Sequence, residues 1–153
     1  MVLDGKPLTE NVAILTALSK LYPEAGLLAT QDLMAEVQAL SMLARCASGL
    51  HPYVTRLCMP QFICDVESAA PRIQEIGADM LIKSLTILEA QLQGRNWFLR
   101  DWPAVDAYVF WVLKRIQGAS IGTNGFTNLV SYSQRMLARP SVYRALAIEK
   151  FAI

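Results

Sequence analysis

The stretch AVDAYVFWVL, residues 104–113, decides the fold of this chain, because it is apolar on nearly every side of a helix. A helix that is hydrophobic all round belongs in the middle of a packed bundle. We expect it to follow Asp101-Trp102-Pro103 and to run to about Gln117. Its longest apolar run, residues 107–113, is too short to cross a bilayer and is closed by Lys114-Arg115. The stretch therefore predicts the central helix of an all-α protein that is not in a membrane.

Three helices are expected ahead of this one, and two of them lie within the first 52 residues. Thr9 is predicted to cap the first, which Pro23 and Gly26 end. Thr30 is predicted to cap the second, and His51-Pro52 to close or kink it. The apolar residues of the second helix that recur at spacings of three and four are expected to form its buried face: Leu33, Val37, Leu40, Ala44 and Ala47.

Three further helices complete the predicted bundle. One begins near Ala69-Pro71 and stops at Gly94, and another ends where Arg139-Pro140 breaks it. Ser141 is predicted to cap a last short helix, residues 142 to about 150. The first of the three is expected to bury Ile73, Ile76, Met80, Ile87 and Leu88. Only residues 1–8 resemble a strand followed by a turn, so the sequence predicts an all-α helical bundle.

Composition excludes several classes of protein. Hydrophobic residues make up 54% of the 153 residues and charged residues 18%, with a net charge of +1, so neither disorder nor a nucleic-acid partner is expected. The apolar content predicts a face buried against another domain or subunit, and we expect a homodimer. Three cysteines without a secretory leader indicate free thiols in a cytoplasmic protein.

Three motifs occur in the order typical of one family. They are DGKPLTENVAIL at residues 4–15, AVDAY at residues 104–108, and LVSY with RM and RPSV between residues 129 and 142. Together they resemble the cytosolic glutathione transferases over nearly the whole chain. The segment SGLHP, residues 48–52, is similar to the bacterial beta class, in which a histidine at this position contacts glutathione.

The resemblance implies a division of the chain into two parts. Residues 1–22 match the end of a thioredoxin-like domain (its last strand and helix), and residues 27–153 match the helical C-terminal domain. Pro103 departs from the family, which usually has Ser or Thr there as a helix cap, and Asp101 is expected to replace it. The family's catalytic Ser, Tyr or Cys and its cis-proline would precede Met1. The resemblance therefore predicts a truncated gene, a wrong start or a fragment.

Three residues are candidates for the glutathione site. The resemblance assigns Glu10 to the ammonium group of glutathione and Asn11 to its carboxylate, although both could simply open a helix that Thr9 caps. His51 is the only histidine and is expected to contact glutathione, the alternative being an imidazole that bonds the last carbonyls of a helix. The beta class usually has Lys after this histidine, and Pro52 removes that charge.

No catalytic residue and no metal ligand is predicted within the chain. Cys58, Cys64 and His51 match no zinc spacing, and no base is evident beside any cysteine. A second group of residues could line a pocket for a hydrophobic electrophile or could be plain core: Tyr53, Met59, Phe62 and Tyr108. Asp106 is expected to stabilise the start of its helix.

Two functions follow from these features. The first is a glutathione S-transferase that uses glutathione as substrate, for transfer to an electrophile or for thiol–disulfide exchange. Its binding of glutathione is expected to be weak or absent, and its activity lost, in this form. The alternative is a non-catalytic helical module that binds proteins through the same fold. Glu10 and His51 favour the first function, and the missing nucleophile favours the second.

Overall fold

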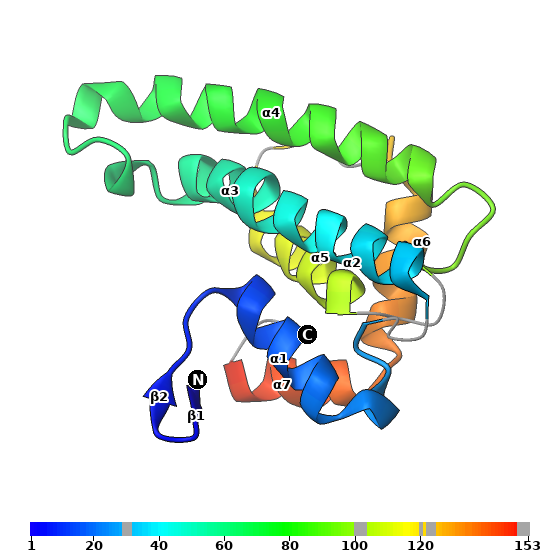
Figure 1. Cartoon of the computed structure of the whole chain (residues 1–153). Coiled ribbons are helices and arrows are strands. Elements are labelled where there is room, and N and C mark those ends of the chain that lie inside the picture. Colours follow the sequence, from blue (N-terminus) through cyan, green and yellow to red (C-terminus); the bar gives the residue numbers. More distant parts are fainter. Residues whose placement is uncertain (29–31, 100–103, 120, 122–124, 150–153) are drawn as a thin grey trace.

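The computed structural model describes residues 1–28, 32–99, 104–119, 121 and 125–149. Seven α-helices account for most of these residues, and a two-stranded hairpin precedes them (Figure 1). The helices are α1 (Asn11–Leu21), α2 (Leu33–Arg45), α3 (His51–Cys58), α4 (Ala70–Gln91), α5 (Ala104–Ile116), α6 (Thr127–Leu137) and α7 (Pro140–Glu149). The hairpin pairs β1 (Val2–Leu3) with β2 (Lys6–Pro7), where a single strand and a turn were expected. The described residues after the hairpin are helices, short 3₁₀ or π turns and loops, as predicted.

The central position predicted for α5 is confirmed. Figure 1 shows α5 below α2 and α3, with the long α4 on the opposite side of those two helices. The residues of α5 that are buried are Ala104, Val105, Asp106, Tyr108, Val109, Phe110, Val112 and Ile116. They lie on several sides of the helix, because α2, α3 and α6 all contact it.

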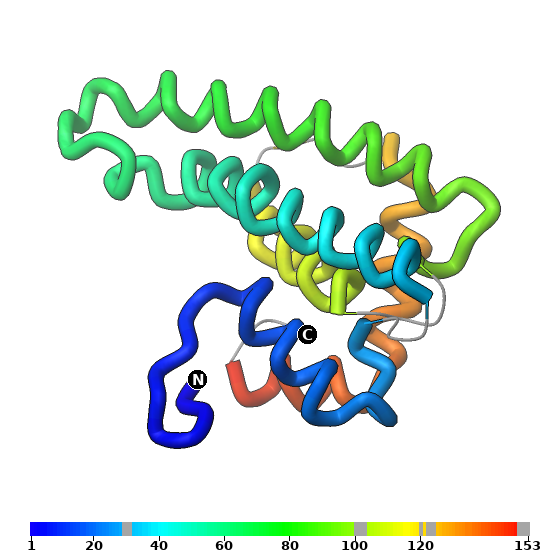
Figure 2. The backbone as a smooth tube through the Cα atoms, in the orientation of Figure 1, coloured from blue at the N-terminus to red at the C-terminus, as the bar shows by residue number. Residues whose placement is uncertain are grey.

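The second helix does not end at His51-Pro52. Figure 2 shows the backbone running on from α2 into α3, through a π-helical turn at Cys46–Leu50. In this wider turn the backbone N–H of His51 bonds the carbonyl of Cys46. Pro52 has no N–H to donate, and it is tolerated because it occupies the first turn of α3. The expected closure at His51-Pro52 was therefore wrong, and the alternative, a kink at this point, stays a prediction.

The buried faces expected for α2 and α4 were also largely wrong. Leu33 is 78% exposed and Val37 is exposed too, whereas α2 buries Ala39 and Leu43. On α4 the buried residues are Gly77, Leu81, Leu85 and Leu88, and Ile76, Met80 and Ile87 are exposed. Both helices carry apolar residues on two sides, so the spacing alone did not show which side meets the bundle.

The helix caps differ from most of the expectations. Glu10, and not Thr9, is the N-cap residue of α1. Thr30 lies outside the described residues, and the Asp32 side chain accepts the N–H of Met34 at 2.9 Å to cap α2. The last helix begins at Pro140, one residue before Ser141, because proline suits a first turn. Asp101 and Pro103 lie outside the described residues, so the cap of α5 stays a prediction.

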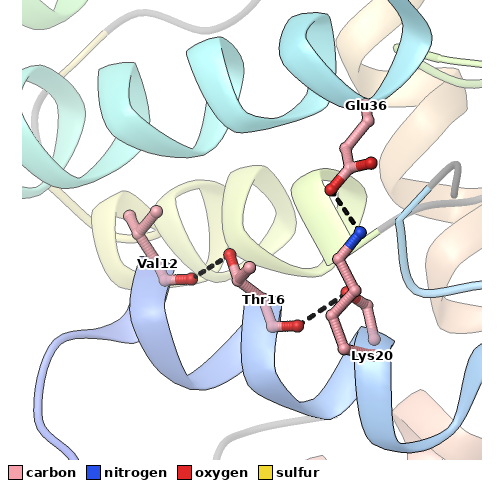
Figure 3. A network of polar contacts seen from close by, with 5 residues as sticks. Val12, Thr16, Lys20 and Glu36 are labelled. Carbon is pink, nitrogen blue, oxygen red and sulfur yellow. Dashed lines mark hydrogen bonds and ion pairs between the residues drawn. The ribbon is translucent and has the colours of Figure 1, made fainter. Parts of the chain in front are cut away.

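An ion pair joins α1 to the rest of the bundle. The Nζ of Lys20 lies 2.6 Å from Oε1 of Glu36 on α2 (Figure 3). Within α1, the Thr16 hydroxyl donates to the carbonyl of Val12 at 2.7 Å. The pair brings the end of α1 beside the start of α2.

Candidate glutathione-binding site

The backbone of Glu10 is strained. Its φ is 65° and its ψ is 121°, a conformation that a residue with a Cβ rarely adopts. Its side chain makes no capping hydrogen bond that would explain the conformation. Such strain costs roughly 1–3 kcal/mol and is found most often at binding and catalytic sites. The corner that opens α1 is therefore a candidate site on physical grounds.

Asn11 and His51 line one pocket, although they are far apart in the sequence. The pocket has a volume of about 390 Å³. Its walls come from α1, the start of α3 and one side of α5: Asn11, Ile14, Leu15, His51, Ala104, Ala107, Tyr108 and Trp111. The side chain of Glu10 is exposed and lies beside this wall, not in it. The structure thus brings two of the three predicted site residues together and places the third next to them.

The imidazole of His51 is held by two aromatic residues of α5. Its Nδ1 lies 2.9 Å from the hydroxyl oxygen of Tyr108. The ring centroid of Trp111 is 4.5 Å from that of His51. These contacts place the ring in the pocket wall, so the alternative role, in which the imidazole bonds the last carbonyls of a helix, does not describe it.

Burial raises the pKa of Tyr108, and a hydrogen bond from the Asn11 side chain opposes the rise. The hydroxyl is therefore protonated at neutral pH and can act as a donor. Burial also raises the pKa of Cys46 to about 12, and it raises the pKa of Cys58. These two cysteines remain thiols at neutral pH, and no cysteine is among the described residues that line the pocket. The pocket offers hydrogen-bond donors and an apolar floor, with the carboxylate of Glu10 at its edge.

The four residues that were expected to line an electrophile pocket do not lie together in the structure. Only Tyr108 lies in the pocket; Tyr53 and Met59 are absent from its lining, and Phe62 is 70% exposed. The sequence reasoning missed Trp111. Its spacing of three from Tyr108 puts both rings on one side of α5, and that spacing could have revealed it.

The described part of the chain offers neither a metal site nor a membrane-spanning helix. No group of three or more His, Cys, Asp and Glu side chains there could hold a metal ion. No described helix is long and apolar enough to span a membrane.

Comparison with known proteins identifies the fold. The chain is 30% identical over 150 residues to a glutathione S-transferase of Xanthomonas campestris, a match that covers 97% of this chain and 74% of the relative. The chain belongs to the glutathione S-transferase family. A second relative, the glutathione S-transferase GstA of Escherichia coli O157:H7, is 29% identical over 147 residues, covering 95% of this chain and 70% of the relative. No family model matches the chain.

Solved glutathione S-transferases have the same arrangement of helices. The enzyme of Xylella fastidiosa matches with a TM-score of 0.88 at 25% identity, covering 99% of this chain and 74% of that one. A beta-class enzyme of Sphingomonas chungbukensis matches with a TM-score of 0.85 at 25% identity, covering 99% and 73%. A sphingomonad glutathione S-transferase in complex with glutathione matches with a TM-score of 0.81 at 27% identity, covering 99% and 73%. The resemblance to the beta class of glutathione S-transferases is thereby confirmed.

Proposed function

We propose that this chain carries the helical part of a glutathione site, and that the complete enzyme transfers glutathione to an electrophile or exchanges thiols with disulfides. The observation that carries the proposal is the meeting of Asn11 and His51 in one pocket, beside the strained Glu10. The structure of a similar sphingomonad glutathione S-transferase holds glutathione, which supports the choice of ligand.

Each of the three residues suits one part of glutathione. The exposed carboxylate of Glu10 can pair with the ammonium of the γ-glutamyl end. Asn11 begins α1, where backbone N–H groups and the helix dipole favour an anion, so its amide suits the neighbouring carboxylate. His51 lies across the pocket and can donate from its imidazole. A hydrophobic electrophile would then lie against the aromatic side, near Trp111.

We further propose that the 153 residues alone are inactive and bind glutathione weakly. Activating the thiol of glutathione requires a donor aimed at its sulfur. The hydroxyl of Tyr108 is already engaged by His51, and Cys46 is buried with a raised pKa. With three residues at one end of the ligand, we expect millimolar binding, or about 4 kcal/mol.

An initial-rate assay with glutathione and a reactive aryl halide tests this proposal. It compares the chain with a fusion that places a thioredoxin-like glutathione S-transferase domain ahead of Met1. We expect turnover only from the fusion, and a large loss of kcat/KM when Glu10→Gln or His51→Ala is introduced into it. The matched control is Glu24→Gln, which removes an exposed acid beyond the end of α1. Equal kcat/KM for the short chain and the fusion would show that the chemistry lies within the helices.

A non-catalytic protein-interaction module is the second candidate function. Apolar side chains at the end of α1 and the start of α2 are exposed and favour it: Leu21, Tyr22, Leu33, Met34 and Val37, here called the α1–α2 patch. Glutathione titration separates the candidates. Saturable binding that His51→Ala abolishes supports the transferase, and no binding by the fusion supports the module.

The same patch supports a homodimer. The Lys20–Glu36 ion pair holds the end of α1 beside the start of α2, so the apolar side chains gather in one region. Burying such a region in a symmetric contact with a second copy would remove it from water.

We propose a cytoplasmic location, because all three cysteines are free thiols.

We also propose that residues 1–22 belong with a thioredoxin-like domain and residues 27–153 form the helical one. Two features separate the two ranges: the 3₁₀ turn at Pro23–Ala25, and Gly26 after it, whose backbone is left-handed. Limited proteolysis tests the division, with first cleavage expected between residues 22 and 27.

A further inference from the structure

The contact between His51 and Tyr108 determines which nitrogen of the imidazole carries the proton. Tyr108 is 8% exposed, so its hydroxyl has little access to water and relies on protein partners. Nδ1 of His51 lies 2.9 Å from the hydroxyl oxygen, and the two rings meet edge to face at 83°. A neutral imidazole has one N–H and one acceptor nitrogen, so this single bond can select between two tautomers.

The need of the buried hydroxyl for an acceptor decides the direction of the bond. Nδ1 of His51 is the one acceptor that the described residues bring within hydrogen-bond distance of the Tyr108 hydroxyl. If Nδ1 carried the proton, it would face the hydroxyl as a donor, and the hydroxyl proton would be left without an acceptor. The hydroxyl proton of Tyr108 is therefore donated to Nδ1 of His51.

We propose that Tyr108 is a positioning residue, which donates its hydroxyl proton to Nδ1 of His51 and holds the imidazole in the tautomer protonated at Nε2. This proposal rests on the function proposed above and names how that site is prepared. A partner at one imidazole nitrogen sets the role of the other, as it does in metal and catalytic sites.

The consequence for the site is a neutral N–H donor that is ready before the ligand arrives. Among the described residues no hydrogen bond occupies Nε2, so its N–H is left for an acceptor on a ligand in the pocket. The Trp111 ring, 4.5 Å from the imidazole, restricts its rotation. The group that Nε2 recognises is thus an acceptor, such as a carboxylate of a peptide thiol.

The single histidine makes the tautomer directly measurable. Two-bond and three-bond ¹⁵N–¹H correlations of the ¹⁵N-labelled chain, recorded without ligand at a pH where the imidazole is neutral, report which nitrogen is protonated. We expect the wild-type spectrum to show protonation at Nε2 alone. Tyr108→Phe should move both nitrogen shifts toward the averaged values of two exchanging tautomers. Tyr53→Phe, which removes the hydroxyl of a half-buried tyrosine two residues from His51, should leave them unchanged.

Two results would overturn the proposal: a wild-type spectrum protonated at Nδ1, or a Tyr108→Phe spectrum identical to wild type. The wild-type spectrum decides even if the Tyr108→Phe chain does not fold. A glutathione titration of the fusion adds a second test, in which Tyr108→Phe should weaken binding about 2- to 10-fold and have no further effect after His51→Ala. If Tyr108→Phe weakened glutathione binding equally in the fusion with His51 and in the His51→Ala fusion, the positioning role would be overturned. A fusion that binds no glutathione contradicts the proposed function and leaves the tautomer result standing.

Discussion

Glu89 on α4 caps α6 through Asn128. Its Oε1 accepts the backbone N–H of Asn128 at 2.8 Å, and the Asn128 side chain donates back to the carbonyl of Glu89 at 3.4 Å. The other carboxylate oxygen accepts the N–H of Leu129 at 2.9 Å. A helix N-terminus leaves its first N–H groups without partners, and here an acid from another helix satisfies two of them. The N-cap residue of α6 itself, Phe126, has no side chain that can do so.

Removing this carboxylate should destabilise the fold. We expect Glu89→Ala to lower the free energy of unfolding by about 1–2 kcal/mol, because two N–H groups lose a charged acceptor next to the helix dipole. Glu89→Gln should lose less, since the amide oxygen can still accept one bond. Urea denaturation measures both, with Glu75→Ala as the control, because Glu75 is exposed and its ion pair is with the equally exposed Arg72. Equal stability of Glu89→Ala and wild type would show that the cap contributes nothing.

Asp106 should make stability depend on pH. Burial raises its pKa from 3.8 to about 7, against the hydrogen bond from the N–H of Phe98. Between these two values the folded state binds more protons than the unfolded state, so stability falls as pH rises from about 4 to about 7 and then levels. The size of the effect is up to roughly 4 kcal/mol.

The matched variant is Asp106→Asn, which keeps an oxygen for the N–H of Phe98 and cannot titrate. Its unfolding free energy, measured by denaturation at several pH values, should change less over this range than that of wild type. Parallel pH curves for the two proteins would contradict the raised pKa.

Gly77 sets the distance between α3 and α4. A Cβ at this position would lie 2.8 Å from Cβ of Arg56 and 2.9 Å from the backbone N of Leu57. Gly77→Ala should therefore force the helices apart and cost about 1–3 kcal/mol, as overpacking does. The control is Gly49→Ala, since a Cβ there would meet, among the described residues, only the Tyr53 side chain at an ordinary contact distance of 3.9 Å. Thermal melts should show a lower Tm for the first variant and an unchanged or higher Tm for the second.

Leu33 should matter for assembly and not for folding. It is exposed in the first turn of α2, where an added acid favours the helix dipole, so Leu33→Glu should leave the monomer stable. If the α1–α2 patch forms the dimer contact, this variant should sediment as a monomer where wild type is a dimer. Ile148→Lys, at a residue of α7 that is 81% exposed, is the control. A wild-type monomer at high concentration, or a dimer of Leu33→Glu, would exclude this contact.

Local features of the sequence were enough to predict the helical class, the central position of α5 and the family. Residues 104–113 are apolar on all sides, so the environment of that helix does not depend on which side meets a neighbour. The family followed from three motifs in order, the first of which also pointed to Glu10 and Asn11, while the segment SGLHP at residues 48–52 pointed to His51. Their binding of glutathione stays a prediction.

The tertiary structure decided what depends on contacts between distant segments. Helical spacing favoured Leu33 and Val37 as core, yet α2 turns Ala39 and Leu43 inward, because periodicity describes one helix and burial requires a partner. The contact of His51 with Tyr108 joins residues on separate helices and could not be read from either segment. The strain at Glu10 is likewise visible only in the backbone, since the sequence there allowed an ordinary cap at Thr9. Sequence by itself determined most of the helical segments, through local propensity and pattern, but not α3, which lies beyond the expected stop at His51-Pro52. Long-range packing determined which helix faces form the core and the site.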